Sequence, residues 1–200
     1  MEAQHRLEGE VARRNLLEHP FYRAWTDGTL PVAALATYAA EYGAFIGVVA
    51  EGWETLGETD HADEERHHTE LWQQFAAGLG TAVGGATLPA VEALVASAQE
   101  CFSDPAEAVG ALYAFERQQP ATAASKLAGL EAWYDLPDSA HTYFRVHADN
   151  DYEADMLADH LSGLDRDEQD RAVAACGRVS EALWDALTDV HERHPTDCPS

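Results

Sequence analysis

Apolar residues recur along almost the whole chain at intervals of three and four positions, the spacing that gathers them on one face of an α-helix. The first segment shows the pattern, with Leu7, Val11, Leu16 and Leu17 as its apolar positions. No stretch alternates apolar and polar residues over any length, as a half-buried β-strand would. The pattern therefore predicts an all-α fold.

Proline and glycine residues mark where the predicted helices begin, bend and end. Pro31 suits the first turn of a long helix, Gly80 follows the end of another, and Pro120 predicts a kink inside a fifth. We expect a bundle of about seven helices that forms one domain over residues 1–193, followed by a flexible tail at 194–200. The predicted helices cover residues 3–18, 31–56, 60–79, 88–101, 105–130, 139–161 and 165–193.

Composition narrows the cellular setting. The chain has 200 residues and 46% apolar content, enough for one full hydrophobic core. Its N-terminus lacks the basic and then apolar pattern of a signal peptide, and it contains no run of about 18 apolar residues that would span a membrane. Its cysteines, Cys101, Cys176 and Cys198, lie scattered without metal-type spacing, which is typical of reduced thiols. These features predict a cytoplasmic protein.

The charge of the chain is unusual for its size. It has 36 acidic residues against 12 basic ones, a net charge of −24, and Lys126 is its only lysine. Nucleic acids and anionic membranes are poor partners for such a surface, because phosphate binding requires clustered cations. Our hypothesis for the excess of acid and the near-absence of lysine is a halophilic source.

Histidines and acidic residues that could hold a metal lie at helical spacing in two segments. In the third predicted helix, Glu65 and His68 are three residues apart and share a face, and Glu64 could share it from four residues away. In the sixth, His147 and Asp151 are four residues apart. Such pairs arise often by chance in a chain with 10 histidines and 36 acids, so each pair alone is typical of a helix surface.

Glu116 is a further candidate, because it interrupts the strongly apolar segment LYAFERQQP. A carboxylate there costs free energy unless something compensates it. Arg117 or Arg145 could do so, and so could a metal ion. Carboxylates and imidazoles that converge from several helices are the usual ligands of a non-haem iron or manganese centre. The metal hypothesis thus requires all three elements to meet inside the bundle.

Four segments of the chain resemble blocks of the heme-oxygenase-like superfamily, which groups TenA-type thiaminases, PqqC and the non-haem di-iron oxidases. They are HPFYRAWTDGTLPVAALATYAAEYGAF (19–45), HHTELWQQFAAGLG (67–80), LYAFERQQPATAASKLAGLEAWYDL (112–136) and YFRVHADNDYEAD (143–155). The resemblance covers about residues 7–190 with the order of the blocks intact, and the last two blocks favour the di-iron oxidase branch. It implies a bundle of seven helices, often a dimer, around a central pocket.

The resemblance also implies a set of metal ligands. Carried to this sequence position by position, they are Glu65 with Glu64 as its alternative, His68, Glu116, His147 and Asp151. The last histidine of the family's HxxxDxxH run falls on Ala154, which cannot bind a metal, so the chain could hold one iron or two. Asp155 could reach inward in its place. The expected cofactor is iron, with manganese as an alternative. The haem-binding histidine of the superfamily has no counterpart, so we expect no haem.

These residues favour a non-haem iron oxidase or oxygenase that acts on a small organic substrate with O2. The expected wall of the substrate pocket includes Tyr42, Trp72, Tyr113 and Phe144. The first alternative is a TenA-like aminopyrimidine hydrolase, but the mid-chain block has Glu116 where that mechanism needs a cysteine nucleophile. The second is a non-catalytic member of the superfamily that binds a ligand or a partner. Ala154 favours this second alternative, since metal sites decay by losing ligands.

Overall fold

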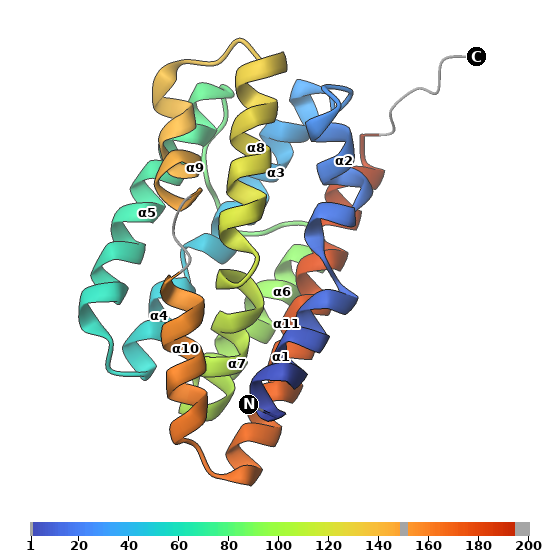
Figure 1. Cartoon of the computed structure of the whole chain (residues 1–200). Helices are drawn as coiled ribbons and strands as arrows, with labels where there is room; N and C mark the ends of the chain where they lie inside the picture. Colours follow the sequence, from blue (N-terminus) through green and yellow to red (C-terminus); the bar gives the residue numbers. More distant parts are fainter. Residues whose placement is uncertain (1, 149–151, 195–200) are drawn as a thin grey trace.

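The computed structural model describes residues 2–148 and 152–194, and every regular element in those ranges is a helix. The longer helices run along one common direction and form a bundle (Figure 1). The α-helices are α1 (Glu2–Arg13), α2 (Pro20–Thr26), α3 (Val32–Ile46), α4 (Val49–Thr55), α5 (Thr59–Gly78), α6 (Pro89–Phe102), α7 (Pro105–Glu116), α8 (Gln119–Trp133), α9 (Thr142–His147), α10 (Tyr152–Gly163) and α11 (Arg166–Glu192), and the 3₁₀ helices are η1 (Leu16–Glu18) and η2 (Asp138–His141). The predicted all-α fold class is confirmed.

Helices α5, α6 and α11 match the predicted helices within one residue at each end. Their ends are set by local chemistry that the sequence displays. At the start of α11 the Asp165 carboxylate accepts a hydrogen bond from the Glu168 amide at 2.9 Å, and the Glu168 side chain accepts one from the Asp165 amide. At the start of α6, Pro89 occupies the first turn.

The other four predicted helices are divided in the structure, and the first of them, 3–18, forms α1 and η1. The predicted helix 31–56 forms α3 and α4, 105–130 forms α7 and α8, and 139–161 forms η2, α9 and α10. At the α7–α8 break, the Gln118 side chain donates to the carbonyl of Ala114 and accepts from the amide of Leu16. The Gln118 side chain thus satisfies the Ala114 carbonyl at the end of α7 and links the break to η1. Because the predicted helices 105–130 and 139–161 are divided, Glu116 is the last residue of α7 and His147 the last of α9.

Helix α7 lies at the centre of the bundle, where it packs along α11 (Figure 1). Every residue of α7 from Ala108 to Glu116 is buried. The two helices approach so closely that a Cβ atom placed on Gly110 would lie 1.8 Å from the carbonyl oxygen of Ala172. Only glycine fits at this point of contact, and the contact fixes where the end of α7 lies inside the bundle.

One helical stretch, Val32–Thr55, is long and apolar enough to cross a membrane by length and composition alone. Its most apolar window has a mean hydropathy of 1.5, and 56% of that window is buried inside the bundle. The sequence reading found no such stretch, because it required an uninterrupted apolar run. Core helices of soluble proteins satisfy the same criteria, so the stretch is weak evidence for a membrane span. The cytoplasmic location stays a prediction.

A single cluster of buried apolar side chains extends from Ala3 to Val190. The expected organisation as one domain requires such a core, and it stays a prediction. Most of the expected tail lies outside the described residues, as does Cys198. Cys101 and Cys176 are buried free thiols.

Candidate metal centre

Helix α5 contributes two polar side chains to its inward face. Its buried residues follow the helical period, and Glu65 and His68 fall on the same face as Trp72 and the rest of the apolar set. Glu65 is 2% exposed and His68 5%. The Glu64 side chain is 47% exposed, and its Oε1 lies 4.0 Å from Nε2 of His68. Burial thus favours Glu65 over Glu64 as the inner carboxylate.

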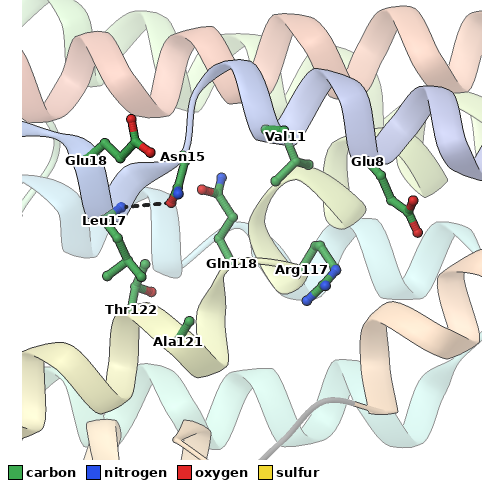
Figure 2. A pocket seen from close by; sticks show the side chains of 10 residues that line it. Glu8, Val11, Asn15, Leu17, Glu18, Arg117, Gln118, Ala121 and Thr122 are labelled. Carbon is green, nitrogen blue, oxygen red and sulfur yellow. Dashed lines mark hydrogen bonds between the residues drawn. The ribbon is translucent and has the colours of Figure 1, made fainter.

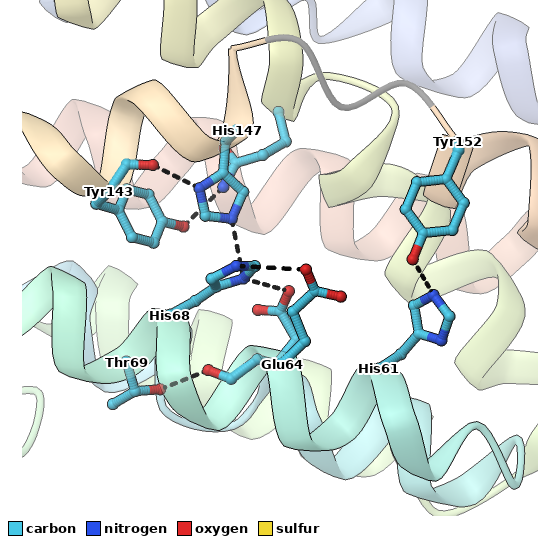
Figure 3. Close-up of polar contacts among 9 residues, drawn as sticks. His61, Glu64, His68, Thr69, Tyr143, His147 and Tyr152 are labelled. Atoms are coloured by element: carbon cyan, nitrogen blue, oxygen red, sulfur yellow. Dashed lines mark hydrogen bonds and ion pairs between the residues drawn. The ribbon is translucent and has the colours of Figure 1, made fainter.

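His147 reaches the same place from α9, as Figure 3 shows. Its Nε2 lies 3.1 Å from Nδ1 of His68, and its Nδ1 lies 2.6 Å from the carbonyl oxygen of Tyr143. A carbonyl oxygen only accepts, so Nδ1 carries the proton and Nε2 directs a lone pair at His68. Tyr143 is itself held in place, because Gln119 donates to its hydroxyl at 2.7 Å.

Glu65, His68 and His147 form a compact buried cluster. One ligand atom from each lies within 4.8 Å of the other two. Oε1 of Glu65 and Nε2 of His147 both direct lone pairs at Nδ1 of His68, which can carry only one proton. A cation among the three atoms would accept all three lone pairs, and carboxylate with imidazole is a donor set that suits iron and manganese.

Glu116 adds a second buried carboxylate near this cluster. Its exposed fraction is 1%, and neither of its oxygens has a hydrogen-bond donor. Burial raises its pKa well above the ordinary range, and the nearby charges of Glu153 and Glu65 raise it further. Oε2 of Glu65 also has no donor. Unpaired buried acceptors are costly and a metal ion would satisfy them, so the residues present fit a metal.

Protonation of the two histidines follows their surroundings. Burial acts to lower the pKa of His68, but its hydrogen bond to Glu65 and the charges of Glu65 and Glu64 outweigh burial and raise it. Burial and the neighbouring His68 lower the pKa of His147 to about 3. His147 is therefore a neutral imidazole at physiological pH, the form that binds metals.

The sequence analysis did not single out Glu153, which lies on α10 and is 2% exposed. Burial and the charge of Glu65 raise its pKa, and its carboxyl interacts with that of Glu116. It was missed because it sits in an acidic run, DNDYEAD, where a continuous helix would direct positions 151 and 154 inward. Asp151 lies outside the described residues. The suggested replacement, Asp155, is exposed and lines a surface cavity.

The chain matches a known protein family over most of its length. Residues 14–184 match the family described as iron-containing redox enzymes. The chain belongs to this family. The matched region contains α5, α7 and α9 entirely, and so includes Glu65, His68, Glu116 and His147.

The relatives that match this chain include two proteins named 4-aminobenzoate synthase. The one from Nitrosomonas europaea is 31% identical, and the match covers 94% of this chain and 90% of the relative. The one from Chlamydia pneumoniae is 26% identical and the match covers 96% of each chain. Both relatives thus correspond to this redox-family chain over nearly its whole length.

Solved structures with the same fold include a TenA homolog from Pseudomonas syringae pv. tomato, with a TM-score of 0.75 at 16% identity over 94% of this chain and 90% of that one. A CADD-like protein of unknown function from Nostoc punctiforme has a TM-score of 0.67 at 16% identity, over 97% and 96% of the two chains. At this identity the likeness shows the fold alone. The predicted heme-oxygenase-like bundle is confirmed.

In this iron-containing redox family member, three of the four expected pocket residues pack together beside the cluster. The ring centroids of Tyr42 and Trp72 are 5.8 Å apart, and those of Trp72 and Phe144 are 6.0 Å apart. Tyr143 links this aromatic group to the cluster, since its ring centroid lies 4.2 Å from that of His147. Their role in substrate binding stays a prediction.

Tyr113, the fourth expected pocket residue, lies apart from the other three. It lines a cavity of about 300 Å³ together with Arg117, Ala154 and Asp155. A second cavity, of about 560 Å³, lies between α1 and the α7–α8 break, and Figure 2 shows Arg117 and Gln118 on its wall. The cluster residues line neither cavity.

Lys126 is a second buried polar residue that the sequence analysis did not assign to the site. Its Nζ lies 3.4 Å from the hydroxyls of both Tyr22 and Tyr38, and 5.3 Å from the ring centre of Phe144. Burial lowers its pKa to about 7, so much of the amine is uncharged at neutral pH. The signal was available: the only lysine of the chain stands in the apolar segment ATAASKLAGL.

Proposed function

We propose that the protein is a non-haem iron oxidase that uses O2 to transform a small organic substrate. The observation that carries the proposal is the buried cluster of Glu65, His68 and His147, with the unpaired carboxylate of Glu116 beside it. Iron bound there would supply the binding and reduction of O2 at its open coordination positions. The family to which the chain belongs supports iron over manganese.

Each residue of the cluster has a definite task in this proposal. Glu65, His68 and His147 would hold one ion, and the Tyr143 carbonyl keeps His147 in the tautomer that offers Nε2. Glu116 would bridge towards a second ion, since both of its oxygens are free. The surrounding aromatic side chains exclude water, which strengthens the electrostatic interactions within the site.

The names of the relatives suggest the product. Two 4-aminobenzoate synthases match this chain over nearly its whole length, one of them at 31% identity. We therefore propose that the reaction yields an aminated aromatic carboxylic acid of the 4-aminobenzoate type. The hydrolase alternative lacks support beyond the shared fold, since Phe115 and Glu116 stand where its cysteine is needed. A homodimer in the cytoplasm stays part of the prediction.

The test uses His68→Ala, with His67→Ala as its control because His67 is the exposed neighbour on α5. We expect the wild type, loaded with ferrous iron under anaerobic conditions, to bind one to two irons per chain by elemental analysis. His68→Ala should lose most of the iron while keeping its helical circular dichroism. Wild type and His67→Ala should also restore growth of a bacterium that cannot make 4-aminobenzoate, and His68→Ala should not.

The two measurements separate the parts of the proposal. A wild-type chain that binds no iron after anaerobic loading would contradict the oxidase. A chain that binds iron through His68 but fails to restore growth would retain the metal centre and lose the proposed product.

A further inference from the structure

The resemblance places the last histidine ligand at position 154, where this chain has alanine. The burial of the residues of α10 shows which of them face the interior. Helix α9 ends at His147, and on α10 (Tyr152–Gly163) both Glu153 and Ala154 are buried. In one continuous helix, residue 154 would lie two turns after His147 on the same face, and Glu153 would be rotated from it by about 100°. The burial of Glu153 shows that the inward face of α10 includes position 153 as well as position 154.

The buried acid of α10 is Glu153. Its exposed fraction is 2%, whereas Asp155 is exposed; Ala154, which is 8% exposed, also lines the surface cavity with Tyr113. Helix α10 packs directly on α7, the helix that ends in Glu116. Burial and the charge of Glu65 raise the pKa of the Glu153 carboxyl, while the Glu116 and His68 side chains act to lower it. Glu153 is therefore the acid of α10 that faces the interior beside α7.

Three carboxylates are thus buried in the interior, one each from α5, α7 and α10. Glu65 and Glu116 both keep oxygens without a hydrogen-bond donor. Repulsion between neighbouring carboxylates adds to the free-energy cost of burying them, and only protons or a cation can neutralise their charge. The nearest imidazoles, His68 and His147, already form the first metal position together with Glu65.

We infer that Glu153 supplies the ligand that Ala154 cannot, so that Glu116 and Glu153 together hold a second iron ion beside the one on Glu65, His68 and His147. The inference rests on the proposed function, since it assumes that the centre holds iron. Among the described residues, the centre then has three carboxylates and two imidazoles, and the three negative charges largely offset those of two ferrous ions. The ligand then comes from position 153 instead of position 154, and the second metal position is retained.

The test compares Glu153→Gln, which keeps shape and removes charge, with Asp155→Asn, which removes one charge from the exposed face of the same helix. We expect two irons per chain in the wild type and in Asp155→Asn, and one in Glu153→Gln, by elemental analysis after anaerobic loading. After oxidation, Glu153→Gln should show the electron paramagnetic resonance signal of isolated high-spin ferric iron, whereas the coupled ferric pair of the wild type should give no such signal. Glu153→Asp should retain part of the second iron, and metal-free thermal unfolding should show that each variant folds.

The outcomes distinguish this inference from the proposed function. If the wild type binds no iron, the proposed function fails and the inference fails with it. If the wild type binds iron and Glu153→Gln binds the same amount with the same spectrum, Glu153 is not a ligand, and its carboxyl shares a proton with Glu116 instead. Loss of both irons in Glu153→Gln, or loss of one in Asp155→Asn, would likewise overturn the assignment.

Discussion

At the scale of single residues, the interior holds ionisable groups in two very different settings. The carboxylates and imidazoles of the cluster face one another, and each can be neutralised by a shared metal or proton. Lys126 instead lies among the phenols Tyr22 and Tyr38, whose own pKa values burial raises. These phenols stay neutral, so burial of the amine is not offset by a negative charge from them.

The setting of Lys126 predicts a pH dependence of stability. Its pKa is about 7 in the folded protein and about 10.5 in the unfolded chain, so between these values the unfolded chain binds more protons. Stability should therefore rise with pH across this range, by up to about 1.4 kcal/mol per pH unit from this group. Lys126→Met should be more stable than wild type at pH 7, and the difference should shrink towards pH 10.5. Urea unfolding at several pH values measures it.

Arg23→Met is the control, because Arg23 is an exposed cation on α2. It should leave the slope of stability against pH unchanged. A Lys126→Met protein with the same slope as wild type would show that the amine is charged and solvated in the folded state.

At the scale of helices, the breaks in the long predicted segments place the functional side chains. Glu116 ends α7, His147 ends α9 and Glu153 lies in the first turn of α10, so all three stand at or next to helix ends. Helix α5 is unbroken and presents Glu65 and His68 to them by its period alone. The position of α7 depends in turn on its close packing against α11.

This packing predicts a large effect of Gly110→Ala. The added methyl would lie within 2 Å of the Ala172 carbonyl oxygen, at 1.8 Å, and backbone cannot yield as a flexible side chain does. We expect the free energy of unfolding, measured by chemical denaturation, to fall by about 1–3 kcal/mol or more. Gly9→Ala is the matched control, since a Cβ there meets nothing within 4 Å inside α1. It should stabilise by about 0.5–1 kcal/mol, and equal effects of the two substitutions would contradict the close approach.

At the scale of the whole molecule, the surface carries a large negative charge. The net charge is −24, and several surface arginines are paired across helices, as in Arg14–Glu181 and Arg171–Asp104. Exposed pairs of this kind contribute little each. The excess of acid is thus left to repel itself, and this repulsion opposes the compact state.

Repulsion of this kind predicts that salt stabilises the fold. The screening length falls from about 10 Å at 0.1 M salt to about 3 Å at 1 M. We expect the melting temperature to rise between 0.05 M and 1 M KCl, and a continued rise at higher KCl would support the halophilic source. A melting temperature that is the same at low and molar salt would contradict both the repulsion and that hypothesis. Differential scanning calorimetry is the measurement.

Much of the fold could be predicted because helix periodicity and end signals are local. The capping box at Asp165 and the first-turn proline at Pro89 lie within a few residues of the boundaries that they set, and those boundaries match within one residue. The α7–α8 break could be placed only near Pro120, because it also depends on Gln118 bonding to Leu16, far away in the chain. Local patterns do not record such a contact.

The sequence by itself determined the helical class, the family and the polar residues that face inward on unbroken helices, Glu65 and His68. It did so because a helix repeats every 3.6 residues, so spacing along the chain fixes direction around the axis. Only the tertiary structure decided that Glu153 is buried and Asp155 exposed, because burial on α10 depends on which distant helices, α7 among them, cover it. It also decided that Lys126 meets Tyr22 and Tyr38, since burial of a charge depends on which distant helices cover it.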